Sequence, residues 1–129
     1  MIKKTLFLAA PLLLAGIAIG LPAAAPAQAQ AAPNGETLFR QRCASCHSVT
    51  PGKTSPLAPN LIGVVGRKAA SGTFAYSPAL KASNLTWNRA NLDRFLAAPA
   101  RMVPGTRMVI ALPDPAQRAA VLNYLATRR

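Results

Sequence analysis

The chain has 129 residues, 51% of them hydrophobic, which suffices for one domain around one core and is too short for two ordinary domains. Its formal net charge is +12, and its only acidic residues are Glu36, Asp93 and Asp114. A field of this sign speeds encounter with acidic partners. The basic residues are scattered rather than gathered in runs, which argues against a nucleic-acid-binding protein; a basic surface that is merely solvated is the other interpretation.

The N-terminal residues have the organisation of a secretory signal. Lys3 and Lys4 precede an apolar run over residues 6–21, and two Ala-x-Ala cleavage sites follow at 27–31. We expect residues 1–31 to be a secretory signal cleaved near 29–31, and residues 32–129 to be the mature, periplasmic domain. The charge of +12, less those of Lys3 and Lys4, then becomes +10. Retention as a membrane anchor is the alternative, because the apolar run approaches the roughly 20 residues that cross a bilayer.

The first helix is expected from Asn34, a good N-cap, to about Cys46, with Leu38 and Phe39 on its apolar stripe. At its end lies the motif of both cysteines and the single histidine of the chain, Cys43-Ala44-Ser45-Cys46-His47. Thiols at i and i+3 lie on one side of a helical turn, where they can form thioethers with two vinyl groups while the adjacent imidazole binds iron. We therefore expect one haem c, attached through Cys43 and Cys46, with His47 as an iron ligand.

Three other uses of this motif fit the sequence less well. A disulfide between residues three apart closes too short a loop to stabilise the fold much. A thioredoxin-like redox pair needs a strand before the motif, where this sequence reads as helix. A structural zinc site needs four ligands, and the cysteines and histidine supply three.

Residues 48–83 are rich in Pro, Gly, Ser and Thr and are expected to be loop, with short helical turns at most. So long a loop requires something other than secondary structure to order it, and a buried haem would do so. A second helix is expected over 88–97, ended by Pro99, and a last helix from Asp114-Pro115 to about Ala126. With no convincing strand, the expected fold class is all-α.

Two methionines of the expected mature domain are candidates for the second iron ligand, Met102 and Met108. Met108 follows Pro104-Gly105, a pair that favours a tight turn able to direct a side chain back into the core. Ordinary core packing is the commoner use of methionine and remains the alternative for both.

The sequence resembles the class I c-type cytochromes, in particular the mitochondrial-like and bacterial cytochrome c group, from Gly35 to the C-terminus. The resemblance implies that fold: three main helices and long loops wrapped around one covalently bound haem, with His47 and Met108 as the iron ligands. The segments that carry it, besides the cysteine motif, are Gly35-x-x-x-Phe39, Pro59-Asn60-Leu61-x-Gly63, Gly66-Arg67, Phe74-x-Tyr76, Leu85-Thr86-Trp87, Pro104-Gly105-Thr106-x-Met108 and Tyr124-Leu125.

The resemblance also implies roles around the haem. The Pro59 carbonyl accepts a hydrogen bond from the second nitrogen of His47. Tyr76 and Trp87 donate to the haem propionates, and Arg67 offsets the charge of those propionates. Thr106 lies beside the Met108 loop. The other interpretation is that Tyr76 and Trp87 are core aromatics and Arg67 is a surface charge.

Three further positions follow from the same resemblance. Gly35 and Phe39 are expected to pack the first helix against the last one near Tyr124. Phe95 stands where the family usually has a tyrosine whose hydroxyl approaches the methionine sulfur, and its absence is expected to alter the iron–sulfur bond. A redox titration of Phe95→Tyr tests this, and an unchanged midpoint would remove the idea.

The expected function is that of a monomeric one-electron carrier between respiratory, photosynthetic or dehydrogenase complexes, not an enzyme. By resemblance its partners are acidic redox proteins: a quinol-oxidising complex, terminal oxidase, peroxidase, reaction centre or periplasmic dehydrogenase. No nucleic acid is expected to bind, and no stable membrane insertion once the signal is removed. The alternatives are a haem c subunit of a dehydrogenase or oxidase, a membrane-tethered cytochrome, and an open-site haem enzyme or sensor, for which the sequence offers no second histidine.

Overall fold

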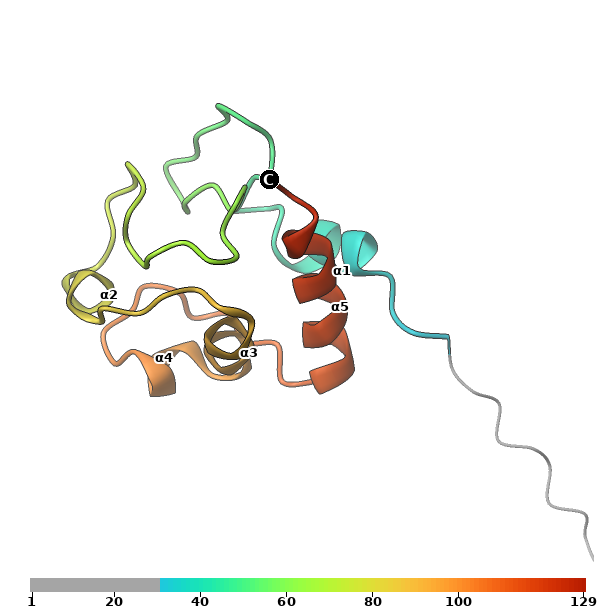
Figure 1. Ribbon diagram of the computed structural model, residues 1–129. Coiled ribbons are helices and arrows are strands. Elements are labelled where there is room, and N and C mark those ends of the chain that lie inside the picture. Colours follow the sequence, from blue (N-terminus) through green and yellow to red (C-terminus); the bar gives the residue numbers. More distant parts are fainter. Residues whose placement is uncertain (1–30) are drawn as a thin grey trace, which may run out of the picture.

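The computed structural model describes residues 31–129, which form helices joined by long irregular segments (Figure 1). The helices are α1 (Gly35–Arg42), α2 (Pro78–Ala82), α3 (Arg89–Ala97), α4 (Pro99–Met102) and α5 (Pro115–Ala126). Across this range an isolated bridge between Lys68 and Thr86 is the only strand-like pairing. The all-α prediction is confirmed, with α1, α3 and α5 as the three main helices.

The predicted secretory signal, residues 1–31, lies outside the described residues except for its last position. Within the described range no helix has the length and hydropathy needed to cross a bilayer.

Four of the helices begin in the same way. A side-chain oxygen just before the helix accepts a hydrogen bond from the backbone N–H three residues later, which satisfies a donor that the helix itself leaves free. The accepting residues are Asn34, Ser77, Asn88 and Asp114, at 2.8 to 3.2 Å. The predicted caps at Asn34 and Asp114 are therefore confirmed, and Pro115 follows in the first turn of α5.

The predicted end of the first helix at Cys46 is wrong by one turn, because α1 ends at Arg42. The N–H groups of Cys43 and Ala44 both donate to the Phe39 carbonyl, at 2.8 and 2.9 Å, which closes the helix. A separate turn then forms around the Cys43 carbonyl, which accepts from the N–H groups of Cys46 (3.1 Å) and His47 (2.9 Å). Both cysteines and the histidine therefore lie on one compact turn.

Pro99 does follow the end of α3, as predicted, but it also starts the short helix α4, which was not predicted. Proline suits the first turn of a helix because its missing N–H would have no intrahelical partner there. Helix α2 is one of the short helical turns expected within residues 48–83.

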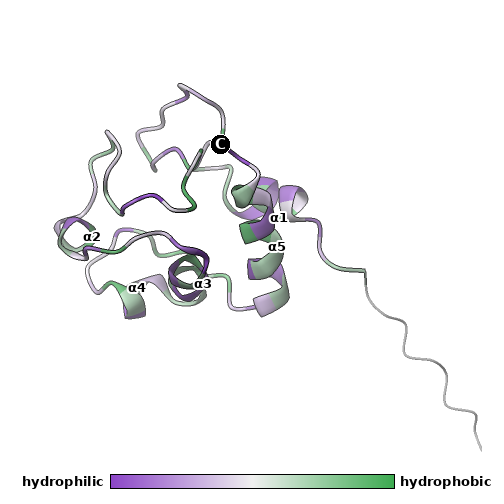
Figure 2. Ribbon diagram, in the orientation of Figure 1, coloured by the Kyte–Doolittle hydropathy of each residue, from purple (hydrophilic) through white to green (hydrophobic). Residues whose placement is uncertain are grey.

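The core forms where α1 and α3 pack on α5. Figure 2 shows both hydrophobic and hydrophilic residues on α3 and α5, as expected of helices with one buried side. Phe39 and Tyr124 lie with their ring centroids 5.4 Å apart between α1 and α5. The buried residues of α5 are Val121, Leu122 and Leu125.

Gly35 lies where α1 crosses α5. A Cβ added there would run into the carbonyl oxygen of Ala120 and would lie 2.8 Å from its carbonyl carbon and 3.0 Å from the Cβ of Tyr124. Because two of these three atoms belong to the backbone of α5, the helices would have to move apart. Only glycine allows this approach, which is the packing role that the resemblance implies for this position.

We expect Gly35→Ala to destabilise the protein. Alanine favours a helix over glycine by about 1 kcal/mol, whereas forcing an extra carbon into a close-packed contact costs about 1–3 kcal/mol, and more where backbone must shift. A net loss of about 1–2 kcal/mol in the free energy of unfolding should appear in denaturant titration. Thr37→Ala, an exposed change in the same helix, is the control, and equal stability of the two variants would contradict this packing.

Candidate haem-binding site

A cavity of about 400 Å³ lies at the centre of the molecule, within the range expected for a ligand site. Its walls come from the turn after α1, the long loop, helices α3 and α5, and the segment between α4 and α5. Most of the lining side chains are apolar. All nine residues predicted to bind the cofactor line it, although they are spread over 66 positions of sequence from the first to the last: Cys43, Cys46, His47, Pro59, Arg67, Tyr76, Trp87, Thr106 and Met108.

His47 is oriented by a single hydrogen bond. Its Nδ1 atom lies 2.7 Å from the Pro59 carbonyl oxygen, and because a carbonyl can only accept, Nδ1 must carry the hydrogen. The lone pair therefore resides on Nε2, the nitrogen left to bind a metal. Burial lowers the pKa of His47, opposed by the Pro59 hydrogen bond, so the ring tends towards the neutral form that ligates iron.

The two cysteines are free thiols that line the cavity. Cys43 is half-buried and Cys46 is exposed, and burial raises the pKa of the Cys43 thiol. The described residues contain no cluster of three His, Cys, Asp or Glu side chains placed to hold a metal ion. The turn therefore offers two reactive sulfurs and one imidazole at the wall of an apolar cavity, which suits a prosthetic group better than a bare ion.

The segment that carries Pro59 is fixed by its neighbour Asn60. The Asn60 amide donates to the carbonyls of Thr50 (2.6 Å) and Lys53 (2.8 Å), and its oxygen accepts from the Ile62 N–H (2.8 Å). No role for Asn60 was predicted from the sequence. The residue type alone could have indicated this role, since an Asn side chain commonly bonds to the backbone two residues further along the chain.

Arg67 lines the cavity, but its guanidinium is held by backbone. Nη1 donates to the Ile62 carbonyl and Nη2 to the Asn60 carbonyl, each at 3.0 Å. This side chain therefore braces the segment that positions the Pro59 carbonyl, a role that was not predicted from the sequence.

Met108 lies on the segment between α4 and α5 and is half-buried in the cavity wall. The tight turn expected at Pro104-Gly105 is present, with Gly105 at φ +89° and the Thr106 N–H donating to the Val103 carbonyl at 3.0 Å. The Thr106 hydroxyl accepts from the Met108 N–H at 3.3 Å. Met102 does not line the central cavity but a separate shallow pocket beside α2 and α4.

The aromatic side chains of the site form two pairs. Trp87 and Phe95 are buried with ring centroids 4.9 Å apart, and Phe74 meets Tyr76 edge-on at 5.4 Å. Phe95 thus lines the same cavity as Met108, at the position where the resemblance leads one to expect a tyrosine.

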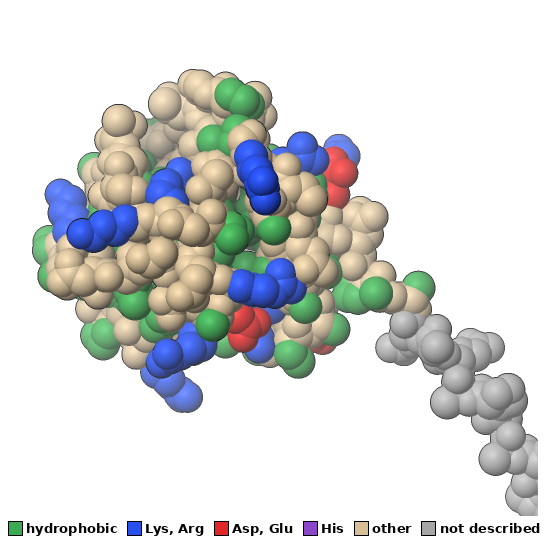
Figure 3. Space-filling model, viewed as in Figure 1, with side chains coloured by type: hydrophobic (Ala, Val, Ile, Leu, Met, Phe, Trp, Pro, Cys, Tyr) green, Lys and Arg blue, Asp and Glu red, His purple; other side chains and the backbone are tan. Residues whose placement is uncertain are grey.

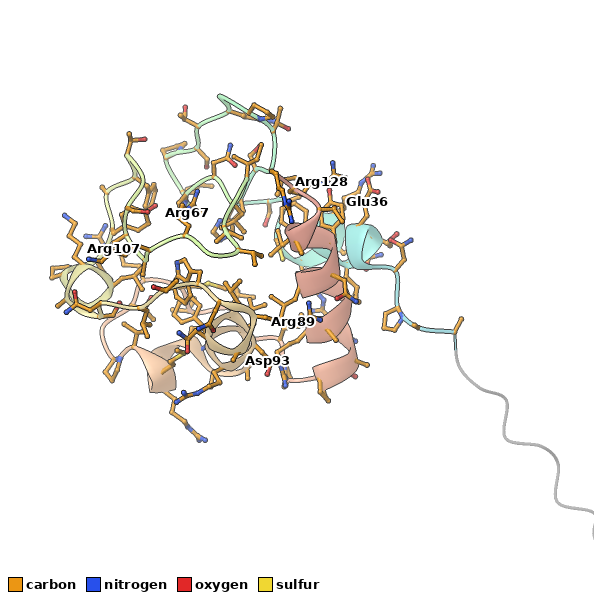
Figure 4. The ribbon with its side chains drawn as sticks, in the orientation of Figure 1. Glu36, Arg67, Arg89, Asp93, Arg107 and Arg128 are labelled. Carbon is orange, nitrogen blue, oxygen red and sulfur yellow. The ribbon has the colours of Figure 1, made fainter. Side chains whose placement is uncertain are left out.

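The charges around the site are positive. Arg42, Arg67, Lys68 and Arg107 line the cavity, whereas none of the three acidic residues does. Figure 3 shows Lys and Arg side chains distributed over the visible face, with acidic ones beside α1 and between α3 and α5. In Figure 4, Arg67 and Arg107 lie on the side formed by the loop and α2, away from Glu36 on α1. Arg107 also spans two segments, because its Nη1 donates to the Ala75 carbonyl at 3.0 Å.

Known proteins are similar to this chain in sequence and in fold. The chain is 44% identical over 92 residues to a cytochrome c from Tetrahymena pyriformis, covering 70% of this chain and 83% of the relative. It is 46% identical over 96 residues to a cytochrome c2 from Rhodomicrobium vannielii, covering 73% and 76%. Among solved structures it is similar to cytochrome cH from Methylobacterium extorquens, with a TM-score of 0.67, 42% identity and coverage of 72% of this chain and 94% of that one.

The match to the family model described as Cytochrome c extends over residues 32–129, which includes every residue of the candidate site. The chain therefore belongs to the cytochrome c family and is a class I c-type cytochrome.

Proposed function

We propose that this protein is a monohaem electron carrier that holds haem c through thioethers at Cys43 and Cys46, with His47 and Met108 as the two iron ligands. The convergence of these four side chains on one apolar cavity carries the proposal. Bound there, haem would supply iron that takes up and releases one electron at a time. No bond of a substrate is made or broken.

The residues of the chain would have three tasks around the haem. Pro59 holds the imidazole of His47 in one orientation and increases its basicity as a ligand. The buried apolar wall, including Trp87 and Phe95, excludes water from the iron. A neutral thioether from Met108 favours the ferrous state and hence a relatively high reduction potential.

The roles of the residues at the haem propionates are proposed from the resemblance. Tyr76 and Trp87 would donate hydrogen bonds to the propionates, and Arg67 would offset their charge. Both aromatic residues are buried and line the cavity, and Arg67 lines the same cavity, which supports this assignment.

We further propose that the protein is exported to the periplasm, works as a monomer and exchanges electrons with acidic redox proteins. The signal-like N-terminus supports export. The positive charge around the cavity supports acidic partners, because complementary charge speeds productive encounter.

Electron exchange should depend on salt with a sign set by the charge of the reactant. Raising the ionic strength from 0.01 to 0.15 M shortens the screening length from about 30 to about 8 Å. Oxidation of the ferrous protein by the anion ferricyanide should then slow by about tenfold. Oxidation by the cationic cobalt(III) tris(phenanthroline) complex, measured by stopped flow in the same buffers, should become faster.

Rates that stay flat for both oxidants would contradict a positively charged exchange surface. Rapid binding of carbon monoxide to the ferrous protein would contradict the carrier function itself, because it would reveal an open iron position of the kind that an enzyme or sensor uses.

A further inference from the structure

Arg118, on α5, bonds to three acceptors in two other parts of the chain. Its Nε donates to Oδ1 of Asp93, on α3, at 2.8 Å. Its Nη1 donates to the carbonyls of Leu112 (3.1 Å) and Pro113 (2.7 Å). The Arg118 side chain is only 11% exposed and that of Asp93 is 41% exposed. The Nε–H edge of the planar guanidinium is thus paired with the Asp93 carboxylate, while Nη1 donates to the two carbonyls.

The two carbonyls lie at one end of the segment that carries Met108. The segment leaves α4 at Val103, a buried residue whose N–H donates to the Pro99 carbonyl at 2.9 Å. It returns to the core at Leu112, also buried, whose N–H donates to the Leu96 carbonyl at 2.7 Å. Between these ends, Val109 and Ile110 are 80% and 58% exposed. Backbone hydrogen bonds therefore attach the segment at its two ends. Between them, Val109 and Ile110 also line the cavity, and the Arg107 side chain bonds to the Ala75 carbonyl at 3.0 Å.

We propose that Arg118, oriented by Asp93, is a positioning residue that anchors the Leu112 end of this segment and so keeps Met108 in the cavity. The inference rests on the proposed function in that Met108 is taken as the iron ligand. Arg118 makes no contact with the cavity, so it acts on Met108 only through the backbone between them.

The guanidinium is suited to this role for a geometric reason. Hydrogen bonds from a charged donor are about twice as strong as neutral ones, and two carbonyls side by side match the fixed directions of the Arg donors. Lysine would keep the charge but has no rigid fork with which to hold Asp93 and both carbonyls together. Asp93 fixes the rotation of the guanidinium, because its carboxylate accepts the hydrogen bond from Nε–H. Nη1 is then directed at the carbonyls of Leu112 and Pro113.

The competing explanation is that Arg118 only joins α3 to α5. Arg89 provides a matched control for that explanation, because it also connects α3 to α5, where its Nη2 donates to the Ala119 carbonyl at 3.5 Å. Arg89 has no bond to Leu112 or Pro113. Figure 4 shows Arg89 and Asp93 on α3 on its side towards α5.

The test measures how often the segment opens in the haem-loaded ferric protein. Imidazole replaces a methionine ligand only after the methionine has left, so the binding rate at saturating imidazole reports the opening rate. We expect Arg118→Met to raise this rate by about tenfold or more, with smaller increases in Arg118→Lys and Asp93→Asn. Arg89→Met should remain within about twofold of the wild type.

A second readout is independent of the iron ligand. Hydrogen exchange of the Leu112 amide should become faster in Arg118→Met and Asp93→Asn, while exchange of the Val121 amide in the core of α5 should follow only the global stability. Asp93→Asn, the milder change, carries the test if Arg118→Met does not fold.

The outcomes separate the two proposals. An unchanged Leu112 exchange rate and unchanged imidazole kinetics in the Arg118 and Asp93 variants would overturn the inference, as would equal effects of Arg89→Met. A wild-type ferric protein without the near-infrared sulfur-to-iron band would instead overturn Met108 as a ligand. In that case Leu112 exchange still decides whether Arg118 anchors the segment.

Discussion

Replacing both Cys43 and Cys46 by alanine is expected to leave the protein without covalently bound haem and without a stable fold. An unfilled apolar cavity costs about 24 cal/mol per Å³, so the cavity of about 400 Å³ corresponds to an upper bound on the order of 10 kcal/mol. The whole stability of an ordinary domain is about 5–15 kcal/mol. The loss of the haem therefore removes stabilising free energy comparable to the whole free energy of unfolding of an ordinary domain.

Two measurements on this variant check the expectation. Pyridine haemochrome spectra should show no thioether-linked haem, and far-ultraviolet circular dichroism should show a helix content well below that of the wild type. Ser45→Ala, which changes the same turn and keeps both thiols, should retain haem and fold. A haem-free double variant with native helix content and cooperative unfolding would show that the core does not depend on the cofactor.

The helices could be predicted because their signals are local. Asn34, Asn88 and Asp114 each precede a helix, and their caps depend only on the next three residues. The exact end of α1 could not be predicted in this way. It depends on the Phe39 carbonyl accepting two N–H groups, which allows a separate turn at Cys43.

The order of the long loop also could not be read from the sequence. Its hydrogen bonds join residues far apart along the chain: the Gly63 N–H donates to the Arg128 carbonyl at 2.7 Å, and Arg107 reaches Ala75. Such pairs follow no helical or strand period, so no pattern marks them. The haem was expected to order this loop, and the described residues show that backbone and side-chain bonds contribute as well.

The candidate site could be named residue by residue for a different reason. Covalent attachment to two thiols and a neighbouring imidazole requires fixed spacing, which the motif at Cys43 displays. Met108 was a candidate from the Pro104-Gly105 turn and from the resemblance together, the other site residues came from the resemblance, and all of them line the same cavity. The residues that brace the site, Asn60, Arg67 and Arg118, were missed in this role because they act through backbone carbonyls, which any residue can supply.

Replacing Met108 by alanine is expected to have the second large effect. Alanine has no atom able to bind iron, so the sixth position would pass to water or another weak ligand. Loss of a neutral thioether also removes a preference for ferrous iron, so the reduction potential should fall. Met102→Ala is the matched control, because Met102 lies outside the central cavity.

The absorption spectrum of the purified ferric and ferrous protein, with the weak near-infrared sulfur-to-iron band, tests the central claim most directly. The account predicts a low-spin ferric spectrum with that band in the wild type and in Met102→Ala, and its loss in Met108→Ala. A wild type that is high-spin, lacks the band, or keeps it in Met108→Ala would contradict ligation by His47 and Met108 and favour an open-site enzyme or sensor, or a different ligand.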